Sequence, residues 1–169
     1  MNLYFDQVKI QKHHFLIIVA EDGLQFVSLT ENGWDEYDQL FPKASDKNTY
    51  TRRPAVIKPY KKALQAYFAG RHPLANLPIS ANLGGTELQQ QVWQALQNIA
   101  VGQTTNYSEL ATEIGQPKSF RAVASAVAKN PVGIFIPCHR VLRKDGGLGD
   151  FRGGLNFKRE LLSLEKGLA

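Results

Sequence analysis

The sequence lacks the features that mark several specialised classes of protein. It has one cysteine in 169 residues, so it can form no internal disulfide and no zinc site built from several cysteines. No apolar run approaches the length of a membrane span, and the longest, at residues 15–20, is the size of a strand. The N-terminus lacks the basic and then apolar pattern of a signal peptide. We therefore predict a cytoplasmic protein without a membrane partner, built from one large domain or two small ones.

The charge of the chain permits nucleic acid as a partner without requiring it. The formal net charge is +5, and the isoelectric point is near 9.4. Lysine and arginine are spread over both halves, so any basic face must arise through folding. Most mildly basic proteins are simply soluble, so charge alone does not identify a DNA-binding protein.

The first half of the chain has the pattern of an α/β domain. Segments rich in apolar and aromatic residues predict strands at 3–10, 15–20 and 24–29, with a turn at Asp22-Gly23 before the third. Helical spacing of apolar residues from Pro54 predicts a helix, which starts there or at Pro59. The proline- and glycine-containing residues 71–85 are the best linker candidate. We therefore predict an N-terminal α/β domain at 1–80 and a C-terminal domain at 81–169.

The second half has the pattern of short, capped helices. Thr86 and Gln89 have the spacing of a capping box, and Asn106 suits the start of a second helix. Pro117 suits the start of a third, ending near residue 128. The second and third helices form either a helix-turn-helix or an ordinary packed helical hairpin, which is more common. The small side chains of the third helix fit either tight packing or close approach to a narrow groove.

The most informative segment surrounds the cysteine. Residues 132–136 predict a short buried strand that Pro137 interrupts, and Cys138 and His139 follow. A lone cysteine is most often a small buried hydrophobe, but an adjacent imidazole can take its proton and make it a nucleophile. Neighbours in a strand point to opposite faces, so contact between these two side chains needs a turn or a bridging water. An acid must orient the imidazole, and Glu165 on a final helix at 157–166 is one of several candidates.

The chain from about residue 86 onward resembles the O6-alkylguanine-DNA alkyltransferases. The similarity rests on the segment Pro137-Cys138-His139-Arg140-Val141 and on a dense set of further motifs. These are Gln91-Val92-Trp93, Asn106-Tyr107, Leu110-Ala111, Arg121-Ala122-Val123, Asn130-Pro131 and Leu161-Leu162 with Glu165. The resemblance implies an α+β fold: a ribonuclease-H-like α/β domain with an antiparallel sheet and a helix, then a mostly helical domain with a helix-turn-helix and a short active-site strand. It implies repair of O6-alkylguanine, and also of O4-alkylthymine, by one irreversible transfer to Cys138, without a cofactor.

The same resemblance assigns a role to each site residue. Cys138 resembles the alkyl acceptor, His139 its water-mediated base, Glu165 the partner of that base, and Asn130 the support of the cysteine loop. Tyr107 looks like the phenol that donates to guanine N3 and helps to rotate the nucleotide, and Arg121 like the finger that fills the vacated stack. The resemblance also assigns DNA contacts to Ser108, Gln116 and Lys144. It implies that Val141, Phe151, Arg152 and Gly153 line the base pocket. The implied partner is double-stranded DNA bound by a monomer through its minor groove, with the damaged base extruded for chemistry.

Three departures and two alternatives accompany this resemblance. Phe151 stands where the family usually has tyrosine, and Arg152 where a small residue is common. Ala128 stands where the family often has a basic residue. Some relatives hold zinc in the N-terminal domain, and this chain lacks the cysteines for it, so we predict no metal. The first alternative is a protein of the alkyltransferase-like class, which binds the lesion without chemistry and lacks the cysteine. The second is a cysteine hydrolase on an unrelated fold.

Overall fold

The computed structural model describes residues 1–169 and divides them into two compact units. Unit 1 comprises residues 1–83 and 131–133, and unit 2 comprises residues 84–130 and 134–169. No helix is both long enough and apolar enough to cross a membrane. The assignment of separate roles to residues 1–80 and 81–169 stays a prediction.

Unit 1 is built on a four-stranded mixed sheet. Its strands are β1 (Asn2–Ile10), β2 (His13–Ala20), β3 (Gly23–Val27) and β4 (Thr49–Arg52), in the order β3-β2-β1-β4. The three predicted strands are confirmed to within two or three residues at their ends. The prediction of an antiparallel sheet is confirmed for β1, β2 and β3 and is wrong for β4, which pairs in parallel with β1. The chain reaches β4 through α1 (Gly33–Leu40) and a short 3-10 turn at Ala44–Asp46, a connection long enough to permit parallel pairing.

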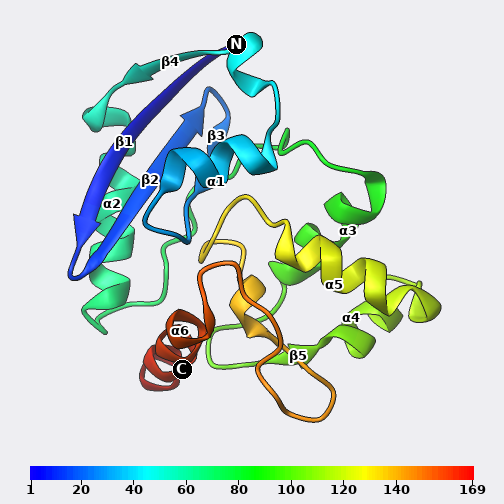
Figure 1. The fold of residues 1–169 in the computed structure, drawn as a ribbon. Helices are drawn as coiled ribbons and strands as arrows, with labels where there is room; N and C mark the ends of the chain where they lie inside the picture. Colours follow the sequence, from blue (N-terminus) through cyan, green and yellow to red (C-terminus); the bar gives the residue numbers. More distant parts are fainter. The chain divides into compact units, whose positions relative to one another are not determined.

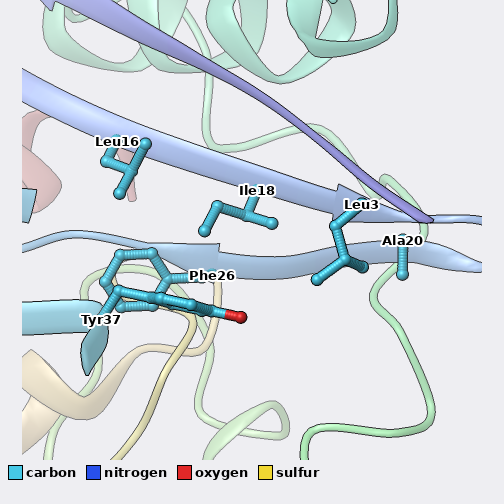
Figure 2. Close-up of a cluster of buried hydrophobic side chains, with 6 residues drawn as sticks. All are labelled: Leu3, Leu16, Ile18, Ala20, Phe26 and Tyr37. Carbon is cyan, nitrogen blue, oxygen red and sulfur yellow. The ribbon is translucent and has the colours of Figure 1, made fainter. Parts of the chain in front are cut away.

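Helices cover both faces of this sheet (Figure 1). Leu16 and Ile18 of β2 belong to a buried cluster with Tyr37 of α1 (Figure 2). Phe15, which points to the opposite face, lies with its ring 5.8 Å from that of Phe68 at the end of α2 (Pro54–Phe68). Burial on both faces explains why residues 15–20 are continuously apolar rather than alternating.

The helix of unit 1 that the sequence predicted begins at its first candidate position. α2 starts at Pro54, whose missing N–H is no loss in the first turn of a helix. Pro59 lies inside the helix and is exposed, so a start at that residue is wrong. The sequence did not indicate α1, which is only eight residues long.

Unit 2 contains four helices and a small parallel sheet. The helices are α3 (Glu87–Leu96), α4 (Tyr107–Glu113), α5 (Phe120–Ala128) and α6 (Leu155–Leu168), and the strands are β5 (Thr105–Asn106) and β6 (Val141–Leu142). Both predicted caps are confirmed: Thr86 and Gln89 form a capping box, and the side chain of Asn106 accepts from the Glu109 N–H at 2.9 Å. α5 follows a 3-10 turn at Pro117–Ser119 rather than beginning at Pro117. It packs on α3 and α4, and the Trp93 indole donates to the Ala126 carbonyl at 2.8 Å.

The segment before the cysteine is buried but is not a strand, so that part of the expectation is wrong. Val132 makes only an isolated bridge to Val27 of β3. Ile134 then adopts a φ of 71°, a left-handed conformation that is rare for a β-branched residue and that ends the extended run. Cys138 lies in a 3-10 turn, Cys138–Arg140, and the short strand of this region, β6, follows the turn.

Candidate active site

The thiol of Cys138 is enclosed within unit 2. The residue is 4% exposed and is the first residue of the 3-10 turn that precedes β6. Burial raises the pKa of the thiol, while a hydrogen bond from the Asn130 side chain and the positive charges of Arg152 and Lys158 act in the opposite direction. The thiol is therefore protonated in the resting protein, and it needs a base to become a nucleophile.

Asn130 connects the end of α5 to the cysteine turn. It is completely buried, and its amide donates to the carbonyl of Ile136 at 2.7 Å. The same amide supports the thiol of Cys138. A single side chain thus fixes the backbone just before the turn and stabilises a negative charge on the sulfur.

His139 makes no hydrogen bond to the thiol of Cys138 and instead binds a buried carboxylate. Successive residues of a 3-10 turn point in directions about 120° apart, which separates this side chain from that of Cys138. Its Nε2 lies 2.6 Å and 3.0 Å from the two carboxylate oxygens of Glu165 on α6. Both side chains are almost fully buried, at 0% and 1% exposure. The sequence offered Glu165 as one acid among several, and the fold brings this one to the imidazole.

Two donors hold the Glu165 carboxylate in its ionised form. Arg140 Nε donates to the two oxygens at 2.8 Å and 3.1 Å. Burial alone would raise the pKa of Glu165, but the hydrogen bonds from His139 and Arg140 together outweigh it and place the pKa below its usual value. Arg140, which follows Cys138 and His139 in the chain, is therefore a structural member of the site.

This arrangement selects one tautomer of His139. Burial lowers the pKa of His139 more than Glu165 raises it, so the imidazole is neutral near neutral pH. A carboxylate can only accept, so Nε2 carries the hydrogen and Nδ1 carries a lone pair. Nδ1 is buried and has no hydrogen-bond partner in the protein. The geometry leaves a basic nitrogen available, with no direct hydrogen bond to the thiol.

Lys158 of α6 is a buried cation that the sequence did not indicate. It is completely buried, and its ammonium donates to the carbonyls of Val141 at 2.7 Å, of Asp150 at 3.2 Å and of Leu148. Burial lowers its pKa to about 8, against the opposing charges of Cys138 and Asp150. Its only sequence signal is a lysine at a position where α6 faces inward, four residues after Gly154.

Tyr107 lies against the loop that follows β6. Gly149 has a φ of 70°, and a Cβ added there would lie 2.8 Å from the Tyr107 hydroxyl, so only glycine allows this approach. Burial raises the pKa of Tyr107, with further contributions from the charges of Asp150 and Cys138. The phenol therefore remains a hydrogen-bond donor near neutral pH, within the electrostatic range of the sulfur.

The expected base pocket is the loop at residues 149–154 together with β6. Val141 is buried, and Phe151, Arg152 and Gly153 are partly exposed. The rings of Phe151 and Phe157 lie 6.1 Å apart in an edge-on arrangement. Arg152 extends to the end of α5, where its guanidinium donates to the carbonyls of Ala128 and Asn130. These residues border the cysteine turn, and their contact with a base stays a prediction.

The expected DNA contacts lie on the outside of unit 2, apart from the chemical centre. Arg121 is exposed on the first turn of α5, with its guanidinium 5.9 Å from the Phe120 ring. Gln116 and Lys144 are exposed, and Ser108 is partly exposed in the first turn of α4. None of these four side chains makes a hydrogen bond to the cysteine or its neighbours, so all four are available to contact DNA. Their roles in DNA binding stay predictions.

Replacing the shared carboxylate tests the arrangement around His139. We expect Glu165→Gln to lower the transfer rate constant by about a hundredfold, within the range that a positioned base contributes. Removing one partner of a buried ion pair should also reduce the free energy of unfolding by about 3 kcal/mol. Single-turnover kinetics and urea unfolding measure the two effects. Glu87→Gln, at the exposed first turn of α3, is the matched control, and an equal loss there would contradict a specific role for Glu165.

The chain is similar to known proteins both in sequence and in fold. The family description "6-O-methylguanine DNA methyltransferase, DNA binding domain" matches residues 87–167. An inducible methylated-DNA–protein-cysteine methyltransferase of Bacillus subtilis is 34% identical over 164 residues, which span 97% of this chain and 90% of the relative. The crystal structure of a Mycobacterium tuberculosis O6-methylguanine methyltransferase superimposes with a TM-score of 0.82 at 32% identity, covering 99% of this chain and 94% of that one. A Mycobacterium tuberculosis OGT in complex with DNA gives a TM-score of 0.78 at the same identity, over 98% and 93% of the two chains.

Proposed function

Since the chain belongs to the methylated-DNA–protein-cysteine methyltransferase family and repairs O6-methylguanine in DNA by transferring the methyl group to a cysteine, we propose that Cys138 is the acceptor. The observation that carries this proposal is the buried hydrogen bond between Glu165 and His139. It leaves the basic Nδ1 of His139 without a partner, in the same 3-10 turn as Cys138. Cys138 is also the only cysteine in the sequence.

The first step is deprotonation of the thiol. Nδ1 of His139 accepts the proton through a water molecule, because the imidazole makes no direct hydrogen bond to the sulfur. Glu165 stabilises the imidazolium that forms, and Arg140 keeps that carboxylate ionised. Asn130, Lys158 and Arg152 stabilise the thiolate.

The second step is an in-line displacement at the methyl carbon. The thiolate forms a bond to carbon as the bond from carbon to guanine O6 breaks, and the electron pair of that bond leaves with guanine. Tyr107 donates to guanine N3 and so stabilises the negative charge that develops on the base. The product is a thioether, which neither hydrolyses readily nor exchanges with thiols, and no second cysteine can remove the methyl group. Each molecule therefore acts once, without a cofactor.

The DNA-binding part of the proposal concerns how the base reaches the sulfur. The chain binds DNA. We place double-stranded DNA on the exposed surface of α4 and α5, with the minor groove against the small side chains of α5. Arg121 enters the stack in place of the extruded nucleotide, while Ser108, Gln116 and Lys144 bind the backbone. The extruded base lies among Val141, Phe151, Arg152 and Gly153, and O4-alkylthymine is a second substrate of this pocket.

Intact-mass measurement after mixing the protein with methylated duplex tests the role of Cys138. The expected result is a stoichiometric gain of one CH2 unit, located by peptide mapping on Cys138. Binding without a change in mass would favour a lesion-binding protein of the alkyltransferase-like class, which lacks this cysteine. Repeated turnover of small esters by unmodified protein would favour a hydrolase. Either outcome would overturn the proposal.

The pH dependence of alkylation reports the state of the thiol. Because burial raises the pKa of Cys138, the thiolate fraction of the folded protein is small near neutral pH and grows with pH. We expect the rate constant for iodoacetamide in the absence of DNA to rise about tenfold per pH unit from about pH 7 to about pH 9. Urea-unfolded protein is the control, with a plateau near the ordinary thiol pKa. A plateau below about pH 8 in the folded protein would contradict the direction of the shift.

A further inference from the structure

The loop at residues 149–154 is held to the rest of unit 2 in two different ways. At its start, the fully buried ammonium of Lys158 donates to the carbonyls of Leu148 and Asp150. Toward its end, the guanidinium of Arg152 donates to the carbonyl of Ala128 at 2.7 Å and to that of Asn130 at 2.8 Å. The first attachment is internal, whereas the second is made by a partly exposed side chain.

The acceptors of Arg152 lie where a cation binds well. Ala128 is the last residue of α5, and the carbonyls of a final helical turn lack partners within the helix and carry partial negative charge. Asn130 is the residue whose own amide holds the carbonyl of Ile136, two residues before Cys138. Arg152 therefore joins the pocket loop to the end of α5 and to the segment that carries the cysteine.

Access to the sulfur requires the segments that enclose it to move, and this loop is hydrogen-bonded to Asn130 at the start of the segment that carries the cysteine. Cys138 is 4% exposed, yet the alkyl carbon of an extruded base must come within bonding distance of its sulfur. The half of the loop that contains Arg152 is the part that can move, because one of its two hydrogen bonds is exposed and the other is only partly buried, whereas Lys158, which holds the start of the loop, is completely buried. Gly154, with a φ of 92°, ends this half and offers the backbone freedom for a hinge.

We propose that Arg152 is a specificity-determining residue that latches the loop at 149–154 to the end of α5, next to the segment that carries Cys138, and so restricts the pocket to small O6 substituents. This inference rests on the proposed role of Cys138 as the acceptor. A methyl group requires the smallest displacement of the loop. A larger substituent, such as benzyl, requires the hydrogen bonds to Ala128 and Asn130 to break.

The test is the ratio of two transfer rate constants, measured on duplexes that differ only in carrying O6-benzylguanine or O6-methylguanine. Both reactions use the same sulfur and the same DNA contacts, so the ratio cancels changes in thiolate fraction and in phosphate binding. Arg152→Ser should raise the benzyl-to-methyl ratio by about tenfold or more, the scale on which pockets discriminate by size. Arg152→Lys keeps the charge but loses the planar fork that spans two carbonyls, and should give an intermediate ratio.

Controls separate the latch from the chemistry. Arg159→Ser removes the same charge from an exposed position on α6 and should leave the ratio unchanged. An unchanged or lower ratio in Arg152→Ser would overturn the latch, including the case in which both rate constants fall together because Arg152 binds phosphate. If the unsubstituted protein transfers no alkyl group to Cys138, the proposed function itself fails. Circular dichroism of each variant establishes that the ratio is measured on folded protein.

Discussion

We expect Cys138→Ala to abolish methyl transfer and to leave DNA binding intact. The substitution removes the only thiol in the chain, and no other side chain of the site can form a stable thioether. Alanine is small enough to occupy the buried position without strain, so α4 and α5 should keep their surfaces. We expect no detectable mass change on methylated duplex, and a dissociation constant within about twofold of that of the unsubstituted protein, corresponding to less than about 0.5 kcal/mol. Fluorescence anisotropy at fixed salt measures the binding.

A serine at the same position gives a sharper comparison. Cys138→Ser retains a hydroxyl where the thiol stood, but an alcohol is far less acidic and a weaker nucleophile at neutral pH. Transfer should therefore remain undetectable although the hydrogen bond from Asn130 has an acceptor. Residual transfer by either variant would remove Cys138 from its proposed role. Loss of DNA binding by both would show that the cysteine supports the fold of the surface instead.

Lys158→Met should reduce the transfer rate constant by at least about a hundredfold, the scale on which misplacing reacting groups acts. Methionine can fill the buried volume, but it cannot donate to the carbonyls of Val141, Leu148 and Asp150. The buried carbonyl of Val141 costs about 1–3 kcal/mol when it loses its partner, and those of Leu148 and Asp150 lie nearer the surface, so the loop should leave its position to reach water. The positive charge that favours the Cys138 thiolate is lost as well. Single-turnover kinetics with methylated duplex measure the effect.

A pH series distinguishes the electrostatic contribution of Lys158 from its structural one. Because the pKa of Lys158 is lowered to about 8, its charge is present below that pH and is lost above it. The deficit of Lys158→Met should therefore be largest below about pH 8 and should narrow above it as the unsubstituted protein loses the charge. Lys166→Met, exposed on α6, is the control and should match the unsubstituted protein. A deficit that does not change with pH would assign Lys158 a structural role alone.

The sequence predicted best where local chemistry determines local structure. The capping box at Thr86 and Gln89 and the cap at Asn106 needed only side chains three residues apart, and both are present. The strands of unit 1 followed from apolar composition. The predictions that were wrong depended on distant partners: β4 pairs with β1 across forty residues or more, and the segment at 132–136 meets β3 without extending it.

In the active site too, the sequence predicted what depends on neighbouring residues and did not predict what depends on distant ones. Cys138 and His139 are adjacent in the chain, so their proximity could be read from the sequence. The choice of Glu165 could not, because it depends on how α6 packs against the cysteine turn. Lys158 was missed because a lysine on a helix is ordinarily exposed, and only the fold shows that this one is surrounded by carbonyls. The roles of Arg121, Ser108, Gln116 and Lys144 depend on a partner and stay predictions.

Residues 131–133 belong to unit 1, whereas the residues on either side of them belong to unit 2. This arrangement affects the order in which the chain folds. The carbonyl of Pro131 and the N–H of Gly133 both bond to Val27, so this short piece of chain attaches only where β3 has already formed. Closing that contact joins residues about a hundred positions apart, which is entropically slow compared with helix formation. The turn of the nucleophile begins five residues beyond Gly133, and it should therefore form late in folding. A fragment starting at residue 84 would carry every residue of the chemical centre, but it would lack the strand to which residues 131–133 attach.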